Sequence, residues 1–325
     1  HTCALPILDG LVHAPGGRVS LALTRPAADG SDYDTPHLLW LGDSARIDVS
    51  GILQRTPDTS GLLTGRLWGG GDIVLDATAA APGALVVQPG AELLARGAAG
   101  TLDQRVQTGA GAELQRQSLA SDGGSLDVRS NRGLLLQGRV DLSGGGPGAQ
   151  GGTLSVTLES TADSGNTFVL PAERELRLQS TAGTDAGAMD HAGGQAFTSE
   201  VRAELGADTV AMSGAARVAV TAQEAIVLAD GLMLAPALVL SLDSPVLRAE
   251  LDAHAAMSAA RLTWANTRVP VASAVAVRPD PVPVAGAGSV TLAGRQGLVL
   301  DGDLVTQGLG SVALVSGGQM RTEEH

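Results

Sequence analysis

The chain has 325 residues, of which 44% are hydrophobic but only 2% are aromatic, and 44 are glycine. Valine, leucine, isoleucine and alanine must therefore fill the core, and such small aliphatic side chains suit stacked layers of similar strands. All 21 basic residues are arginine, and the net charge of −13 argues against nucleic acid or an anionic membrane surface as a partner.

Both ends of the chain resemble translated sequencing adapters. The two segments are residues 1–7 (HTCALPI) and 321–325 (RTEEH), and we predict that neither belongs to the native protein. The rest would then be an internal fragment of a longer reading frame. Cys3, the only cysteine, lies in the first segment, so we expect no disulfide within the chain.

Residues 8–160 are predicted to form regular strands separated by glycine corners. In TLSVTL (153–158), Leu154, Val156 and Leu158 share one face, while the other face holds serine and threonine. A pattern of aliphatic run, glycine corner and alternating run occurs at 38–51, 84–97, 133–144 and 297–308. Strands that begin with glycine recur at 70–77, 123–130, 151–158, 286–294 and 308–317.

The spacing of these strands indicates a coil of stacked turns. Gly17 and Gly71 are 54 residues apart, and Gly71 and Gly124 are 53 apart, which suggests that some turns carry an extra loop such as 53–69. One turn cannot bury enough apolar surface to offset the entropy of ordering it, so the turns must stack on one another. A dozen or more turns of about 20 residues, about 4.8 Å apart, would form a rod of about 60 Å or longer.

Residues 161–277 follow the pattern less regularly. The longest apolar run, 225–242, is interrupted by aspartate, glycine and proline, so we expect strands there and no membrane-spanning helix. The alanine-rich stretch 249–265 could be a short helix, although its apolar residues do not keep helical spacing. A proline-rich connector, 278–284, precedes the last regular strands at 285–320. Together these patterns predict an all-β solenoid with loops outside the coil.

The repeated sequences LLWLGDSARIDVSG and GLLLQGRVDLSG, with GGxLxV strands between them, resemble the large exoproteins of the filamentous haemagglutinin class. Two-partner systems of Gram-negative bacteria secrete these proteins through an outer-membrane pore. The resemblance implies a right-handed parallel β-helix that is secreted or displayed at the bacterial cell surface. It also implies two kinds of partner, the secretion pore during export and surface receptors bound through the parent protein. The Arg-Gly-Asp tripeptide of some members is absent, since Ala98 follows Gly97.

Few residues of the chain have the spacing of a chemical site. Asp29, Asp32 and Asp34 could form a calcium loop, but their order matches no EF-hand and favours a solvated loop. The glycine-rich segment 144–152 lacks the lysine of a phosphate-binding loop and favours a wide corner. The histidines have no carboxylate at ligand spacing and are scattered over His13, His37, His191 and His254. We therefore predict no catalytic residue, no metal site and no cofactor.

A carbohydrate-active enzyme is one alternative, because polysaccharide lyases and hydrolases also use parallel β-helices. These enzymes need clustered carboxylates, and four aspartates on the polar faces of strands could stack into an acidic strip: Asp48, Asp76, Asp127 and Asp141. The aromatic residues that could hold sugar rings are Trp40, Trp68, Trp264 and Tyr33. An outward strand position explains the aspartates more simply.

The function predicted from the sequence is that of a non-catalytic structural stalk. It would belong to an adhesin-like exoprotein and present adhesive or effector regions away from the cell. The passenger of a single-chain autotransporter, which shares the fold, is the second alternative.

Overall fold

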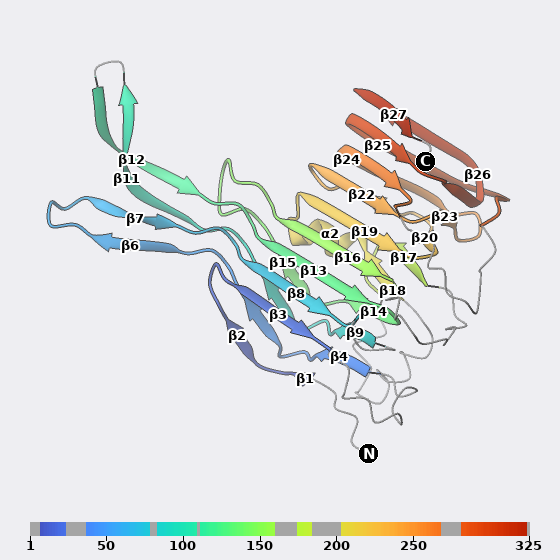
Figure 1. The fold of residues 1–325 in the computed structure, drawn as a ribbon, viewed down its shortest axis with the longest axis horizontal. Helices are drawn as coiled ribbons and strands as arrows, with labels where there is room; N and C mark the ends of the chain where they lie inside the picture. Colours follow the sequence, from blue (N-terminus) through green and yellow to red (C-terminus); the bar gives the residue numbers. More distant parts are fainter. Residues whose placement is uncertain are drawn as a thin grey trace.

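The computed structural model describes residues 7–23, 37–78, 83–108, 111–159, 174–183, 203–267 and 281–323. Within these ranges nearly every element is a β-strand, and the strands stack in parallel along one axis from the first turn to the last (Figure 1). This arrangement is a parallel β-helix, which confirms the all-β solenoid predicted from the sequence.

Three parallel sheets form the walls of the coil. Sheet 1 stacks β3 (Arg18–Ala22), β8 (Asp72–Asp76), β13 (Ser125–Ser130), β16 (Thr153–Leu158), β19 (Arg217–Ala222), β22 (Val239–Asp243), the second part of β24 (His254–Ala265), the last part of β25 (Val284–Asp301) and β27 (Gln319–Glu323). Sheet 2 stacks β1 (Ile7–Leu8), β4 (His37–Leu41), β9 (Gly83–Val87), β14 (Gly133–Leu136), β18 (Ala203–Gly206), β17 (Glu175–Gln179), β20 (Ala225–Leu228), β23 (Val246–Ala249) and the first part of β26 (Val305–Ser316).

Sheet 3 is divided by a helix. Its first part stacks β2 (Leu11–His13), β5 (Arg46–Asp48), β10 (Glu92–Leu94) and β15 (Arg139–Asp141). Helix α2 (Ala207–Ser213) comes next, in contact with β15 on one side and β21 (Met233–Leu234) on the other. Beyond β21 the sheet continues with the first part of β24, the middle of β25 and the second part of β26.

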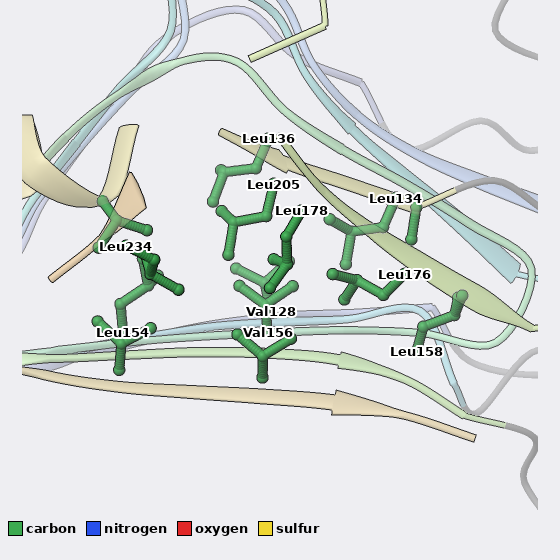
Figure 2. Close-up of a cluster of buried hydrophobic side chains, with 14 of the residues drawn as sticks. Val128, Leu134, Leu136, Leu154, Val156, Leu158, Leu176, Leu178, Leu205 and Leu234 are labelled. Carbon is green, nitrogen blue, oxygen red and sulfur yellow. The ribbon is translucent and has the colours of Figure 1, made fainter. Parts of the chain in front are cut away.

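The interior of the coil is aliphatic. Leu154, Val156 and Leu158 on β16 are fully buried, as predicted, and Val156 lies in register between Val128 and Val220. Figure 2 shows these side chains of sheet 1 facing leucines of sheet 2 across the interior, among them Leu134, Leu136, Leu176 and Leu178. Equivalent positions in successive turns form a column of side chains of similar size. The turns can therefore pack at the distance that separates hydrogen-bonded strands.

A column of glycines explains why glycine precedes the strands of sheet 1. A Cβ on Gly71 would stand 1.9 Å from the carbonyl oxygen of Gly17, and one on Gly124 would stand 1.9 Å from that of Gly71. For Gly152 the corresponding distance, to the carbonyl oxygen of Gly124, is 1.8 Å. No side chain fits between backbones this close, so these positions require glycine.

The long intervals in the first turns are β-hairpins inserted into single turns. β6 (Leu53–Pro57) pairs antiparallel with β7 (Leu63–Leu67), so the predicted extra loop 53–69 is a hairpin. A second hairpin, β11 (Ala99–Thr108) with β12 (Gly111–Ala120), leaves the next turn at the same corner (Figure 1). A turn without insertion needs 22 residues, the interval from Val239 to its partners Arg217 and Arg261.

The coil is shorter than the sequence suggested. Among the described residues nine strands stack in sheet 1, and eight spacings of about 4.8 Å give a length of about 38 Å. The expected rod of about 60 Å is therefore wrong, because hairpins and long connections use residues that bare turns would have used.

The fourth copy of the corner pattern crosses a different corner. At 38–51, 84–97 and 133–144 the chain passes from sheet 2 to sheet 3, whereas at 297–308 it passes from sheet 1 to sheet 2. The glycine-led strands 286–294 and 308–317 likewise lie in sheet 3, where Ser289 pairs with Ser311. All three walls require the same alternation of inward and outward residues, so the local pattern does not identify the wall.

The less regular region contains one strand out of sequence order and one helix. β18 lies between β14 and β17 in sheet 2, although it comes after β17 in the chain. The helix α2 was not predicted; its last residue is Ser213, and Gly214, whose φ of 66° is left-handed, caps its C-terminus. The stretch 249–265 contains β24, so the helix alternative there is wrong. Among the described residues no helix is long and apolar enough to cross a membrane.

The terminal and connecting segments of the chain are only partly described. Ile7 lies in β1, and Arg321–Glu323 lie in β27, so these residues of the adapter-like segments extend the first and last turns. Residues 1–6, 324–325 and the first part of the proline-rich connector, 278–280, lie outside the described ranges. Val284, the last residue of that connector, begins β25.

Candidate functional site

The two hairpins are the most distinctive surface feature and form what we call the arm. The arm comprises β6–β7 and β11–β12, which project from the stacked strands (Figure 1). The hairpins pack on each other where β7 contacts β11, and a Cβ on Gly100 would stand 2.3 Å from Cδ2 of Leu53. Leu102 is buried beside this contact, being 4% exposed. The arm is therefore a packed unit and not two independent loops.

One side chain also ties the hairpins together. The carboxylate of Asp103 on β11 accepts a hydrogen bond from the backbone N–H of Leu63 at 2.7 Å. It also accepts two from the guanidinium of Arg116 on β12, at 2.9 and 3.1 Å. The Arg116 guanidinium and then the Leu63 N–H lower the pKa of Asp103, because both favour the charged carboxylate.

The first hairpin presents an aromatic and cationic face to solvent. The guanidinium carbon of Arg66 lies 3.8 Å from the ring centroid of Trp68, and Trp68 Nε1 donates to Oε1 of Gln54 at 3.4 Å. Trp68 is 38% exposed, whereas the other two tryptophans, Trp40 and Trp264, are 2% and 4% exposed. Tryptophan and arginine are the side chains that most often dominate binding interfaces.

The arm differs from the rest of the chain in charge. Between Ile52 and Trp68 the charged residues sum to +1, from two arginines and one aspartate, and between Ala99 and Ala120 they sum to zero. The two hairpins together carry +1, so the remainder of the chain carries −14 and the whole chain carries −13. The arm therefore lacks the excess of negative charge that the rest of the chain carries.

The four aspartates do not form the acidic strip considered from the sequence. Asp76 and Asp127 lie in sheet 1, but Asp76 pairs with Arg129 and Asp127 pairs with Val74. Asp48 and Asp141 lie in one column of sheet 3, with Leu94 between them. An active site of that kind is not assembled from these residues.

Three of these aspartates instead cap the corners at the ends of their strands. The Oδ1 atoms of Asp48, Asp76 and Asp141 accept from the backbone N–H two residues on, at 3.0, 2.8 and 3.2 Å. The three positions share the sequence motif Asp-x-Ser or Asp-x-Thr, which is typical of an Asx turn. The spacing could have predicted this role.

The outer face of sheet 3 carries alternating charges. Arg46 and Arg139 flank Glu92, with N–O distances of 2.9 and 3.4 Å. Exposed pairs of this kind stabilise a protein by about 0–1 kcal/mol each. They fit the register of the neighbouring turns, since opposite charges alternate along the stack and no like charges are adjacent.

The remaining candidates do not come together. His13 lies 3.9 Å from a carboxylate oxygen of Asp48, and Nδ1 of His254 lies 2.7 Å from Oγ of Ser289. His37 begins β4. Residues outside the described ranges are Asp29, Asp32, Asp34, Tyr33 and His191. In the part of the chain that the structure describes, no group of three or more His, Cys, Asp or Glu side chains could hold a metal ion.

The glycine-rich segment 144–152 is a corner between sheet 3 and sheet 1, as predicted. It occupies the place from which the hairpins leave the two preceding turns. A Cβ on Gly145 would stand 2.0 Å from the carbonyl oxygen of Ala98, and one on Gly151 would stand 1.8 Å from that of Gly214. The glycines therefore allow close packing of neighbouring turns. Comparison with protein-family models, curated proteins and solved structures gave no match to this chain.

Proposed function

We propose that this chain is a structural stalk segment of a secreted or surface-displayed, adhesin-like exoprotein. The observation that supports it is the in-register stack of parallel turns, in which β1 and β27 lie at opposite ends of one axis (Figure 1). Each turn presents the same strand edge to the next, so the fold extends in one direction and holds its two ends apart.

Two further observations support a mechanical role over catalysis. Several carboxylates serve in corner caps and ion pairs, among them Asp48, Asp141 and Glu92. The buried core consists almost entirely of aliphatic side chains. In this proposal the coil supplies a fixed separation, and the arm, with its exposed Trp68, supplies contact area on the side of the stalk.

The secretion route rests on the sequence resemblance alone. Passage through an outer-membrane pore and display at the cell surface are the expected export path, with receptors bound through the parent protein. A parent gene that encodes a carboxyl-terminal membrane barrel would instead assign the chain to an autotransporter passenger. Release of products from acidic polysaccharides by the purified chain would assign it to the enzyme class.

The stalk role can be tested by placing the chain between an outer-membrane anchor and an electron-dense tag on bacterial cells. Cryo-electron tomography should show the tag farther from the membrane by about 40 Å than in a direct fusion, with a narrow distribution. The matched control replaces the chain with a flexible Gly/Ser linker of 325 residues, which should give a broad distribution. A broad distribution for the chain itself would contradict a rigid stalk.

A further inference from the structure

The outer half of the second hairpin stands clear of the rest of the arm (Figure 1). Each strand of β11–β12 has ten residues and each strand of β6–β7 has five, and Asp103 binds the N–H of Leu63, where β7 begins. Beyond that contact Leu114 on β12 is 51% exposed, and its neighbours Glu113 and Gln115 are exposed as well. A ribbon of only two strands is marginally stable in water. This part of the arm therefore has less packing than a stable sheet needs.

β12 is also an open edge. It forms a two-stranded sheet with β11, so among the described residues it has no partner strand on its outer side. At the base of the hairpin the N–H of Ser121 donates to the carbonyl oxygen of Ala98 at 2.8 Å, which makes these two residues a hydrogen-bonded pair. Such pairs alternate with non-hydrogen-bonded pairs along an antiparallel ladder, so the backbone groups of Ala112, Leu114 and Arg116 point away from β11. Another strand can pair with this row of donors and acceptors.

The open edge results from the turns within the chain and not from its ends. The next turn has only the glycine-rich corner 144–152 at the place where the hairpins leave, and the later turns have short corners there. Insertions from neighbouring turns therefore do not cover the outer edge of β12.

We propose that β12 pairs antiparallel with β12 of a second copy, around a two-fold axis at Leu114. Leu114 then lies opposite its own copy, Ala112 lies opposite Arg116, and Glu113 lies opposite Gln115. The pairing uses the outward backbone groups of β12, and it joins two hairpins into one sheet of four strands. A two-fold contact is closed, so the assembly stops at two chains.

The side chains of β12 select this register. A two-fold axis pairs residues whose side chains lie on the same face of the sheet, so the register can change only in steps of two residues. One such step places Glu113 opposite its own copy, and like charges in that position are destabilising. The opposite step places Leu114 against Arg116. Only the register centred on Leu114 brings the two exposed leucines together and opposes no like charges.

The charge distribution permits the contact. The charged residues of the second hairpin sum to zero, whereas the chain outside the two hairpins carries −14. Ala120, at the base of the hairpin, is six positions from Leu114, so the two copies of Ala120 would lie about 40 Å apart along the sheet. Repulsion between exposed charges is screened over about 8 Å at physiological ionic strength. The arms would thus join two chains while keeping their acidic bodies apart.

Light scattering coupled to size-exclusion chromatography of the 325-residue chain, from micromolar to near-millimolar concentration, tests the assembly. The mass should increase from one chain to two and no further. Leu114→Pro removes an outward donor but no bond to β11, and should remain a single chain. Ser118→Pro is the matched control, because its outward donor lies outside the paired residues 112–116, and it should dimerise like the parent chain. A single-chain mass for the parent at every concentration would overturn the proposal, as would association that Leu114→Pro leaves unchanged.

Two cysteine variants, made in a Cys3→Ser background, test the register. The Cα atoms of a hydrogen-bonded antiparallel pair are about 5.5 Å apart, within the range of a disulfide, so Leu114→Cys should crosslink to its own copy. Gln115→Cys is the control, since its copy would lie about 8 Å away, beyond that range. After treatment with oxidised glutathione, a non-reducing gel should show dimers of Leu114→Cys alone. No crosslinking of Leu114→Cys, or equal crosslinking of both variants, would overturn the two-fold pairing at Leu114.

Discussion

The carboxylate of Asp103 accepts a hydrogen bond from the backbone N–H of Leu63 at 2.7 Å, so a side chain of the second hairpin binds a backbone donor of the first. The two residues are 40 positions apart in the chain. This bond joins the two hairpins, which are inserted into successive turns, into a single arm.

Replacing Asp103 with alanine should loosen the arm without unfolding the coil. The backbone amide of Leu63 would lose its acceptor, and the guanidinium of Arg116 would lose its partner. We expect faster hydrogen exchange of the amides in β6 and β7, while the amides of sheet 1 remain protected. Gln104→Ala, at an exposed neighbouring position, is the control and should leave exchange unchanged. Equal protection of Leu63 in both variants would show that the bond does not hold the arm.

The same contact predicts a pH dependence of the arm. Arg116 and the Leu63 N–H lower the pKa of Asp103 in the folded arm. Asp103 therefore binds a proton less tightly in the folded arm than in the unfolded chain, so the arm is more stable when Asp103 is charged. The stabilisation is present in full above the ordinary aspartate pKa of about 4, and it is lost as the pH falls through the lowered pKa. Exchange of the Leu63 amide, corrected for its intrinsic rate, should therefore accelerate only below about pH 4. The Asp103→Asn variant should show no such step.

The inward and outward faces of β16 can be tested with an isosteric pair. Val156→Thr should destabilise the coil by about 1–3 kcal/mol, because it places a hydroxyl among aliphatic side chains without a partner. Thr157→Val makes the reverse exchange on the other side of the strand, where Thr157 is 9% exposed, and should cost less than Val156→Thr, because it places no hydroxyl among the aliphatic side chains of the interior. Urea unfolding followed by circular dichroism measures both. Similar losses from the two substitutions would mean that the register of β16 is wrong.

The glycine column predicts a large effect from a single methyl group. Gly124→Ala should cost about 3 kcal/mol or more, because its Cβ would overlap the carbonyl oxygen of Gly71 and push two turns apart. Gly10→Ala is the control, since a Cβ there meets nothing within 4 Å. Thermal unfolding of both variants gives the comparison, and a Gly124→Ala variant as stable as the control would rule out the close approach.

Leu251 is the only non-glycine residue of the described chain with a positive φ, which is 51°. Its side chain is 88% exposed, so it contributes little packing to offset the strain. Leu251→Asn should stabilise the protein by up to about 1 kcal/mol, because asparagine tolerates the left-handed conformation. For a protein of this size the midpoint of thermal unfolding would increase by about 2 °C. Leu251→Val should act in the opposite direction, since a branched side chain fits that conformation poorly, and a stabilising Val would contradict the explanation.

The sequence by itself determined the fold class and the core. Alternation in segments such as TLSVTL, with glycine before each strand, specifies which side chains point inward, and the aliphatic composition specifies layers of equal thickness. These signals are local, because a strand alternates with period two whatever it pairs with. The corner role of Asp48 and Asp141 was also readable, from the serine two residues on.

Only the tertiary structure decided which wall each strand occupies, and that β18 lies between β14 and β17. It also decided that α2 takes a strand's place in sheet 3, and that Asp103 joins hairpins from different turns. These features depend on contacts between residues tens of positions apart. Because every wall requires the same alternation of inward and outward side chains, the local pattern is identical in all three, and only packing between turns distinguishes them.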